Sequence, residues 1–423
     1  MGKRSRKPRG NRPDRGGGGS QKGVQTPPRG VWIVNGYSAD WLGKGFPWVY
    51  PQEILGRGAP ADIVELRAQD GRVLGRAIPD HGWIAARVYR HDEGPLDRDW
   101  LWETLDRAAA LRDVVIEPDT TAFRLVHGEN DGLPGLRIDW WDHAATVVLD
   151  SPAVAPLLDD VLDWLEDRRQ PRAVYLCYRP DPRDDRDFSR VTPEPGLVRG
   201  HALTADLRVT ERGAAFLVRP WDGPDVGLYT DMRAVRRWLE PHWGGTAVLN
   251  TFAYTGAFSV VAALGGASEV VTVDLSAPYL ERAEANFVAN ELDPSQHTFW
   301  EEDTFKALDR MRRQGQQFDR IILDPPSFSH SSDGTTWSAA RDYPRLVAAA
   351  FRVCAPGGWI IAASNHGQTS PRDFRGWIVD GARKAGVRAQ ELAWLGQSED
   401  VPAATWFPEG RYLKVGVWRM LPG

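Results

Sequence analysis

The sequence is poor in cysteine and has no long apolar run. Only two cysteines occur among its 423 residues, Cys177 and Cys354. Two thiols exclude a disulfide framework and a cysteine-rich zinc site, and this scarcity is typical of proteins in the reducing cytoplasm. No apolar stretch approaches the ~18 residues that cross a bilayer, and the basic N-terminus lacks the apolar segment of a secretory signal. We therefore expect a cytoplasmic protein without a membrane anchor.

Positive charge is concentrated at the N-terminus. Residues 1–30 contain nine Lys or Arg and one acidic residue, Asp14, a net charge of +8. The remaining 393 residues carry 43 basic and 56 acidic residues, a net charge of −13. A segment rich in Arg, Lys, Gly and Pro cannot build a core, so we expect residues 1–30 to be a disordered basic tail. Such a tail either tethers the protein to nucleic-acid phosphates or only improves its solubility, and both interpretations stay open.

Two domains are expected before the second half of the chain. Residues 31–93 predict a small β domain, because two apolar runs flank the hairpin dipeptide Asp70-Gly71. Residues 94–205 combine two amphipathic helices with short strands, which predicts a central α+β domain. Within it, the charged, proline-containing stretch 180–190 is expected to be a surface loop.

The remaining segment, residues 206–423, alternates short apolar strands with helices. This alternation is typical of an α/β domain with a mostly parallel, Rossmann-like sheet and helices on both faces. The clearest expected strands are residues 247–250, 270–273, 321–323 and 359–363.

Glycine and acidic residues follow several of these strands. Ligands bind outside the carboxyl ends of the strands in open α/β sheets. The turn at 250–256 ends in Gly256, which lets a ligand approach the main chain. Asp274 ends the next strand, where a carboxylate can accept both ribose hydroxyls, and Asp303 follows a further strand, where it can accept from an adenine amine. Since no Gly-x-Gly-x-x-Gly is present, S-adenosylmethionine (AdoMet) is favoured over a nicotinamide dinucleotide.

The segment Asp324-Pro325-Pro326-Ser327-Phe328 follows the strand at 321–323. Two prolines there could simply end strand pairing and form a rigid turn. They could also hold main-chain carbonyls beside a substrate, with Phe328 offering a face on which an extruded base can stack. Because cofactor-type residues precede the segment, we favour the second interpretation.

Several segments resemble the bacterial class I AdoMet-dependent methyltransferases of 23S rRNA. The segments are 124–135, 227–233, 250–256, 273–276, 324–328 and 407–414. Their layout is similar to that of the cytosine-C5 methyltransferases with an N-terminal PUA domain, a small RNA-binding β module, and the resemblance covers about residues 31–423. It implies large-subunit rRNA as the substrate and a target-base pocket at Asp324, Pro325, Pro326 and Phe328. It also implies AdoMet binding through Asn250, Phe252, Tyr254, Gly256, Asp274 and Asp303, with Tyr229 and Arg233 closing the cofactor site.

One position departs from the cytosine-C5 enzymes. Their strand corresponding to 359–365 ends in a Ser-Cys segment that supplies the nucleophile, whereas this chain has Ser364-Asn365. Carbon 5 of cytosine needs a thiolate added at carbon 6 before it attacks a methyl group. An Asn at this position resembles the guanine-N7 methyltransferase half of a bifunctional 23S rRNA enzyme, and a ring nitrogen needs only proximity and orientation. We therefore favour a ring or amino nitrogen as the methyl acceptor and count Asn365 among the catalytic residues.

Other candidates and alternative functions remain open. His330 and His366 could serve as general bases. For His330, which lies in an expected Ser-rich loop at 327–334, we favour an RNA contact or no role over catalysis, and for His366 a strand-end cap is the alternative. No metal-binding cluster is visible. A cytosine-C5 enzyme with an atypical site, an RNA-binding protein with an inactive methyltransferase domain, and a methyltransferase acting on a protein or small molecule are the alternatives. Both a monomer and a homodimer are compatible with the sequence.

Overall fold

The computed structural model describes residues 28–179, 188, 193–223, 225–326, 328–330 and 336–421. The expected basic tail up to residue 27, most of the expected loop at 180–190, and Ser327 lie outside the described residues. Within the described ranges, every helix is too short or too polar to cross a lipid bilayer.

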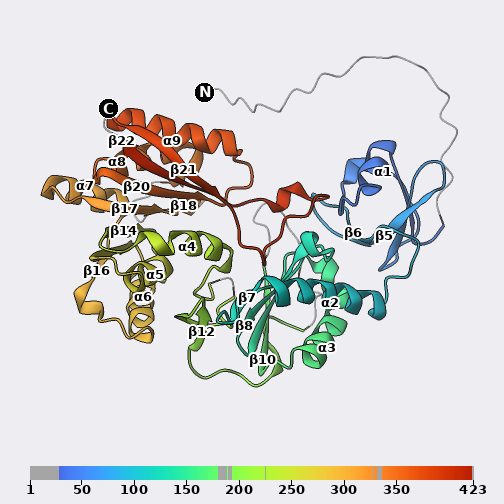
Figure 1. Cartoon of the computed structure of the whole chain (residues 1–423). Helices are drawn as coiled ribbons and strands as arrows, with labels where there is room; N and C mark the ends of the chain where they lie inside the picture. The colour runs from blue at the N-terminus through green and yellow to red at the C-terminus, as the bar shows by residue number, and fades with distance from the viewer. Residues whose placement is uncertain are drawn as a thin grey trace, which may run out of the picture.

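The first unit is a six-stranded sheet with one helix packed on it (Figure 1). Its strands lie in the order β2-β6-β5-β4-β1-β3. The hairpin expected around Asp70-Gly71 is present as the antiparallel pair β4–β5, and Gly71 takes the positive φ of 90° that its turn requires. The elements are β1 (Val31–Val34), α1 (Gly36–Leu42), β2 (Trp48–Val49), β3 (Ile54–Arg57), β4 (Val64–Arg67), β5 (Val73–Pro79) and β6 (Ala86–Arg90).

The second unit is a five-stranded sheet in the order β11-β10-β9-β8-β7, with two helices packed against it. Helix α2 begins at Asp97, whose side chain accepts a hydrogen bond from the main-chain N–H of Trp100. Fully buried Trp164 of α3 lies in the core between helices and sheet. The elements are α2 (Arg98–Val115), β7 (Ala122–His127), β8 (Leu136–Trp141), β9 (Ala144–Leu149), α3 (Leu158–Arg168), β10 (Ala173–Tyr178) and β11 (Gly196–Gly200).

The third unit contains a seven-stranded sheet in the order β16-β15-β14-β17-β20-β22-β21. The first five strands are parallel, and β22 runs antiparallel to both of its neighbours. A hairpin of β12 (Leu207–Glu211) and β13 (Ala214–Val218) precedes it. The sheet strands are β14 (Ala247–Thr251), β15 (Glu269–Asp274), β16 (Thr298–Glu301), β17 (Phe318–Leu323), β20 (Cys354–Ser364), β21 (Arg388–Leu395) and β22 (Lys414–Leu421). The helices are α4 (Arg233–Leu239), α5 (Ala257–Leu264), α6 (Ala277–Ala289), α7 (Thr304–Gln314), α8 (Ala339–Phe351) and α9 (Pro371–Ala385).

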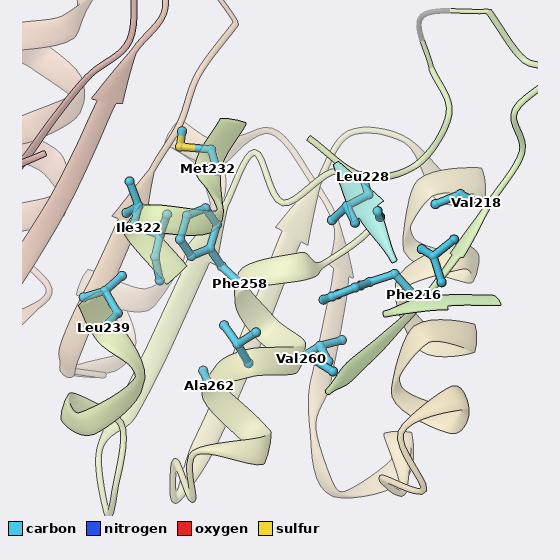
Figure 2. Packing of buried hydrophobic residues seen from close by; sticks show 14 of the residues in the cluster. Phe216, Val218, Leu228, Met232, Leu239, Phe258, Val260, Ala262 and Ile322 are labelled. Carbon is cyan, nitrogen blue, oxygen red and sulfur yellow. The ribbon is translucent and has the colours of Figure 1, made fainter. Parts of the chain in front are cut away.

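The helices of this unit cover both faces of the sheet. Alternate residues of a strand point to opposite faces, so Val248 packs with α4, α5 and α6, whereas Leu249 packs with α7, α8 and α9. Figure 2 shows Phe258 and Val260 of α5 among the apolar side chains of the first of these layers. The expected fold class is therefore confirmed.

One local expectation was wrong for three residues. Residues 327–334 were expected to form a loop, but Phe328–His330 form β18, which pairs antiparallel with β19 (Thr336–Ser338), while Ser327 and residues 331–334 lie outside the described residues. Aromatic and β-branched residues in the two short segments favour an extended pair over an irregular loop. Phe328 therefore lies in a strand that begins just after the Asp-Pro-Pro turn.

Candidate active site

The turn after β14 is a tight main-chain cradle. Phe252, Tyr254 and Gly256 all have positive φ, at 54°, 52° and 74°. Two non-glycine residues in this left-handed region are uncommon and are retained when the surrounding structure holds them there. A Cβ atom at Gly256 would lie 2.8 Å from the Cβ of Ala283 on α6. Glycine is therefore required at this position by both conformation and packing.

We expect Gly256→Ala to destabilise the fold more than a glycine substitution that meets only conformational strain. Gly315 has a similar φ of 69°, and a Cβ there would meet nothing within 4 Å. Gly315→Ala should cost about 1–2 kcal/mol of unfolding free energy, the price of a left-handed alanine. Gly256→Ala should cost at least about 1 kcal/mol more, because it also overpacks against Ala283. Urea unfolding of both variants measures the difference, and equal losses would contradict the packing argument.

Asp274 connects this turn to helix α6. One of its carboxylate oxygens accepts a hydrogen bond from the N–H of Tyr254 at 2.8 Å, and the other accepts from the N–H of Ser276 at 3.0 Å. Burial raises the pKa of the Asp274 carboxyl above its ordinary value, against the effect of these N–H bonds. Each oxygen has a further lone pair beyond its main-chain donor. Asp274 can therefore accept hydrogen bonds from a ligand's hydroxyl groups.

Three tyrosines lie beside the turn. The ring centroid of Tyr254 is 5.2 Å from that of Tyr229 and 4.6 Å from that of Tyr279. Tyr229 is 52% exposed, so part of its aromatic ring faces solvent beside the turn. The structure thus brings Tyr229 together with Tyr254, Gly256 and Asp274.

Three other expected cofactor residues are placed differently. Asn250 is buried, and its side-chain amide donates to the Ser259 hydroxyl at 3.0 Å, which ties β14 to α5. Asp303 is half-buried and caps α7 by accepting from the N–H of Lys306 at 3.1 Å. Arg233 is fully buried, and its guanidinium pairs with Asp400 at 2.6 Å. The side chains of Asn250 and Arg233 therefore make contacts inside the protein that hold neighbouring segments in place.

Asp324 lies at the carboxyl end of β17. Burial, together with the nearby carboxylate of Asp231, raises the pKa of Asp324 to about 7, while Arg236 acts in the opposite direction. Tyr343 links the ends of two neighbouring strands. Its hydroxyl lies 3.3 Å from the carbonyl oxygen of Leu323 on β17 and 2.6 Å from that of Ala363 on β20. A carboxyl group that titrates near neutral pH at a strand end is a candidate for contact with a substrate.

Asp231 and Tyr412 also lie at this end of the sheet. Neither was identified as a site residue from the sequence. The Tyr412 hydroxyl donates to the Asp231 carboxylate at 2.6 Å. Both residues belong to segments that the resemblance had singled out, 227–233 and 407–414. Their position in those segments was a usable signal, but their contact joins residues 181 positions apart.

The segment 396–413 also ties the three units together (Figure 1). Phe407 packs against Trp48 of the first unit, with ring centroids 4.8 Å apart. Gly410 lies so close to Asn130 of the second unit that a side chain at Gly410 would overlap the Asn130 amide. Asp400 accepts from the N–H of Arg124 at 2.7 Å. The segment 396–413 of the third unit therefore contacts both preceding units.

Asn365 is exposed just past the end of β20. The neighbouring strand register pairs Leu323 with Ala362, so Asn365 and Asp324 lie at the same edge of the sheet. Cys354 begins β20 and is therefore at its opposite end, where burial raises the pKa of its thiol to about 12. Cys177 is buried in β10, and burial raises the pKa of this thiol as well.

The two candidate histidines show different placements. His366 is half-buried, and its Nδ1 lies 2.8 Å from the Thr369 hydroxyl, as a residue that caps a strand end would. His330 is the last residue of β18. No group of three or more His, Cys, Asp or Glu residues able to hold a metal occurs in the described part of the chain.

Two family models match this chain. One describes an S-adenosylmethionine-dependent methyltransferase and covers residues 197–395. The other describes a PUA-like domain and covers residues 33–91.

Similar proteins extend over nearly the whole chain. The ribosomal RNA large subunit methyltransferase I of Aeromonas salmonicida is 34% identical over 396 residues, which cover 91% of this chain and 97% of that protein. The protein of the same name from Shewanella amazonensis is 34% identical over 379 residues, covering 88% and 95%. The solved structure of SMU.776, assigned as a methyltransferase and complexed with SAH, has a TM-score of 0.82 at 23% identity and covers 92% of this chain and 99% of its own. At that identity the solved structure shows the shared fold.

Proposed function

Because this chain belongs to the family of the ribosomal RNA large subunit methyltransferases I, and uses AdoMet as methyl donor, we propose that it methylates a base of large-subunit rRNA at a nitrogen atom. We further propose that the reaction takes place in the cytoplasm, where ribosomal RNA is assembled with protein. The observation that carries the proposal is the shared strand edge: Asp274 ends β15, the turn at Gly256 follows its neighbour β14, and Asp324 and Asn365 follow the next two strands, β17 and β20.

The residues around Asp274 fit AdoMet. The carboxylate is partly buried without an ion pair among the described residues, so hydroxyl donors of a ribose would stabilise it. Gly256 lets the turn pack closely against α6 in a left-handed conformation, and Tyr229 offers an aromatic face beside Tyr254. Asp303, at the end of the next strand, can accept from an adenine amine with the oxygen that does not cap α7. When bound, AdoMet supplies an electrophilic methyl group.

We propose that the target base lies beside the ends of β17 and β20, next to Asp324, Pro325, Pro326 and Asn365. Phe328, the first residue of β18, follows this segment in the chain. The ionised Asp324 would accept a hydrogen bond from a base amino group, and the amide of Asn365 would bond to the base edge. These contacts orient a nitrogen lone pair toward the methyl group, and orientation is the main requirement for such an acceptor.

Transfer to carbon 5 of cytosine is disfavoured because it needs a thiolate beside the base. Neither thiol suits this role. Cys354 lies at the wrong end of β20 with a pKa of about 12, and Cys177 is buried in the second unit. An inactive methyltransferase domain is also disfavoured, because the residues at Asp274, Gly256 and Asp324 are all present at the sheet edge.

We expect the protein to transfer label from methyl-labelled AdoMet to rRNA that lacks methylation, and nucleoside mass spectrometry of the RNA to show an N-methylated base. Asn365→Ala should reduce the labelling, because the base loses an orienting contact. Recovery of 5-methylcytidine would overturn the nitrogen assignment, whereas label in protein alone would overturn the assignment of RNA as substrate.

A further inference from the structure

The ammonium group of Lys414 lies inside the protein, close to the residues to which the target base is assigned. Lys414 is 4% exposed. Its Nζ donates to the main-chain carbonyl of His366 at 3.0 Å and to that of Tyr412 at 2.6 Å. Among the described residues it forms no ion pair with a carboxylate. Both of its acceptors lie close to those residues, since His366 follows Asn365 in the chain and the side chain of Tyr412 bonds to Asp231.

A buried ammonium without a carboxylate partner is costly to a folded protein. Desolvation accordingly lowers the pKa of Lys414 below its ordinary value. A methionine would fill a similar volume without this cost. The lysine is therefore unfavourable for stability by itself, unless its hydrogen bonds to the two carbonyls have another use.

The two hydrogen bonds of the Lys414 ammonium group lie beyond the end of the β20–β22 ladder. The β20–β22 ladder ends with the pair Ser364 and Lys414. Asn365 and His366 lie beyond that last pair, where the His366 carbonyl also accepts a hydrogen bond from the N–H of Thr369 at 3.0 Å. The Lys414 side chain reaches past the end of the ladder to the His366 carbonyl and thereby anchors the segment that carries Asn365.

We propose that Lys414 is a positioning residue of the target-base pocket, whose ammonium group holds the Asn365 segment and Tyr412 in one arrangement, so that Asn365 and the Tyr412–Asp231 pair face the same base. This inference rests on the proposed function and names a residue that acts through others. Lys414 touches neither the methyl group nor, in this proposal, the base.

The test compares Lys414→Met with Lys384→Met, a matched substitution at an exposed lysine in the last turn of α9. Lys414→Met should lower kcat by about 100-fold, the effect of a small displacement of an orienting group. AdoMet affinity measured by calorimetry and the KM for RNA should stay within about twofold. Amide hydrogen exchange should accelerate at residues 365–369. Lys384→Met should change none of these quantities.

A double-mutant cycle separates positioning from a general structural role. In the Asn365→Ala background, Lys414→Met should reduce kcat by no more than about threefold further, because both changes remove the same contact. Independent, multiplicative losses would overturn the proposal, as would a Lys414→Met protein that loses AdoMet affinity together with activity. If the wild type labels RNA and Lys414→Met matches Lys384→Met, this inference alone fails. If the wild type does not label RNA, the proposed function fails with it.

Discussion

Asp324→Asn should abolish most methyl transfer, lowering kcat by about 100-fold or more, while leaving AdoMet affinity nearly unchanged. The substitution keeps the shape of the side chain but removes the negative charge that would accept a hydrogen bond from the base amine. In the wild type, kcat should rise with pH through about 7, because the pKa of Asp324 is raised to about 7 and only its ionised form is the acceptor. The variant should lose this pH dependence.

The same substitution should stabilise the protein at neutral and alkaline pH. The pKa of Asp324 is about 7 in the folded protein and about 3.9 in the unfolded chain. Between these values the folded state binds the extra proton, so the stability contributed by Asp324 is present below pH ~4 and is lost as pH rises toward 7. The advantage of Asp324→Asn should therefore grow from pH 4 to 7 and level off above, at no more than about 4 kcal/mol.

Thermal unfolding across this pH range, run beside initial rates, measures both effects on one variant. Asp380→Asn is a suitable control, because Asp380 is an exposed residue of α9 whose ion-pair partner within the described ranges is Arg383, three residues later. It should leave both the rate and the stability essentially unchanged. A variant that is less stable than wild type at pH 8 would contradict the buried, partly protonated state of Asp324.

Asp274→Ala should reduce AdoMet affinity by about 100-fold, equivalent to about 2.7 kcal/mol of binding free energy. The change removes the acceptor for ribose hydroxyls and also the bonds to the N–H groups of Tyr254 and Ser276. The turn would then lose its tie to the start of α6 and keep, within the described part of the chain, the hydrogen bond that the Asn286 amide donates to the Thr255 carbonyl. Titration calorimetry with AdoMet or S-adenosylhomocysteine measures the loss directly.

Glu269→Ala provides the matched control for Asp274→Ala. Glu269 is an exposed residue that begins the same strand, β15, whereas Asp274 ends it. Its substitution should leave cofactor affinity unchanged. An Asp274→Ala protein that binds AdoMet as tightly as the wild type does would remove Asp274 from the cofactor site.

The fold was largely predictable because its signals are local. Alternation of apolar strands and helices was enough for the Rossmann-like class, and Asp70-Gly71 was enough for the β4–β5 hairpin. The Phe328–His330 strand was missed because a three-residue segment carries little periodicity of its own.

The candidate site was predictable only in part, for a physical reason. Asp274 and Asp324 could be placed near each other because parallel strands carry their carboxyl ends to one edge. Which way a side chain turns at such an edge depends on its neighbours. Asn250 turns to Ser259 and Arg233 to Asp400, and neither partner can be identified from local sequence.

The sequence by itself determined the fold class, the order of the strand-end residues, and the presence of Asn365 rather than a cysteine after the strand at 359–363. Those properties depend on periodicity and on residue identity at known offsets. Only the tertiary structure decided that burial and Asp231 raise the pKa of Asp324, that Tyr412 bonds to Asp231, and that Lys414 reaches the His366 carbonyl. These contacts join residues tens to hundreds of positions apart, and their energies depend on burial, which is a property of the folded chain.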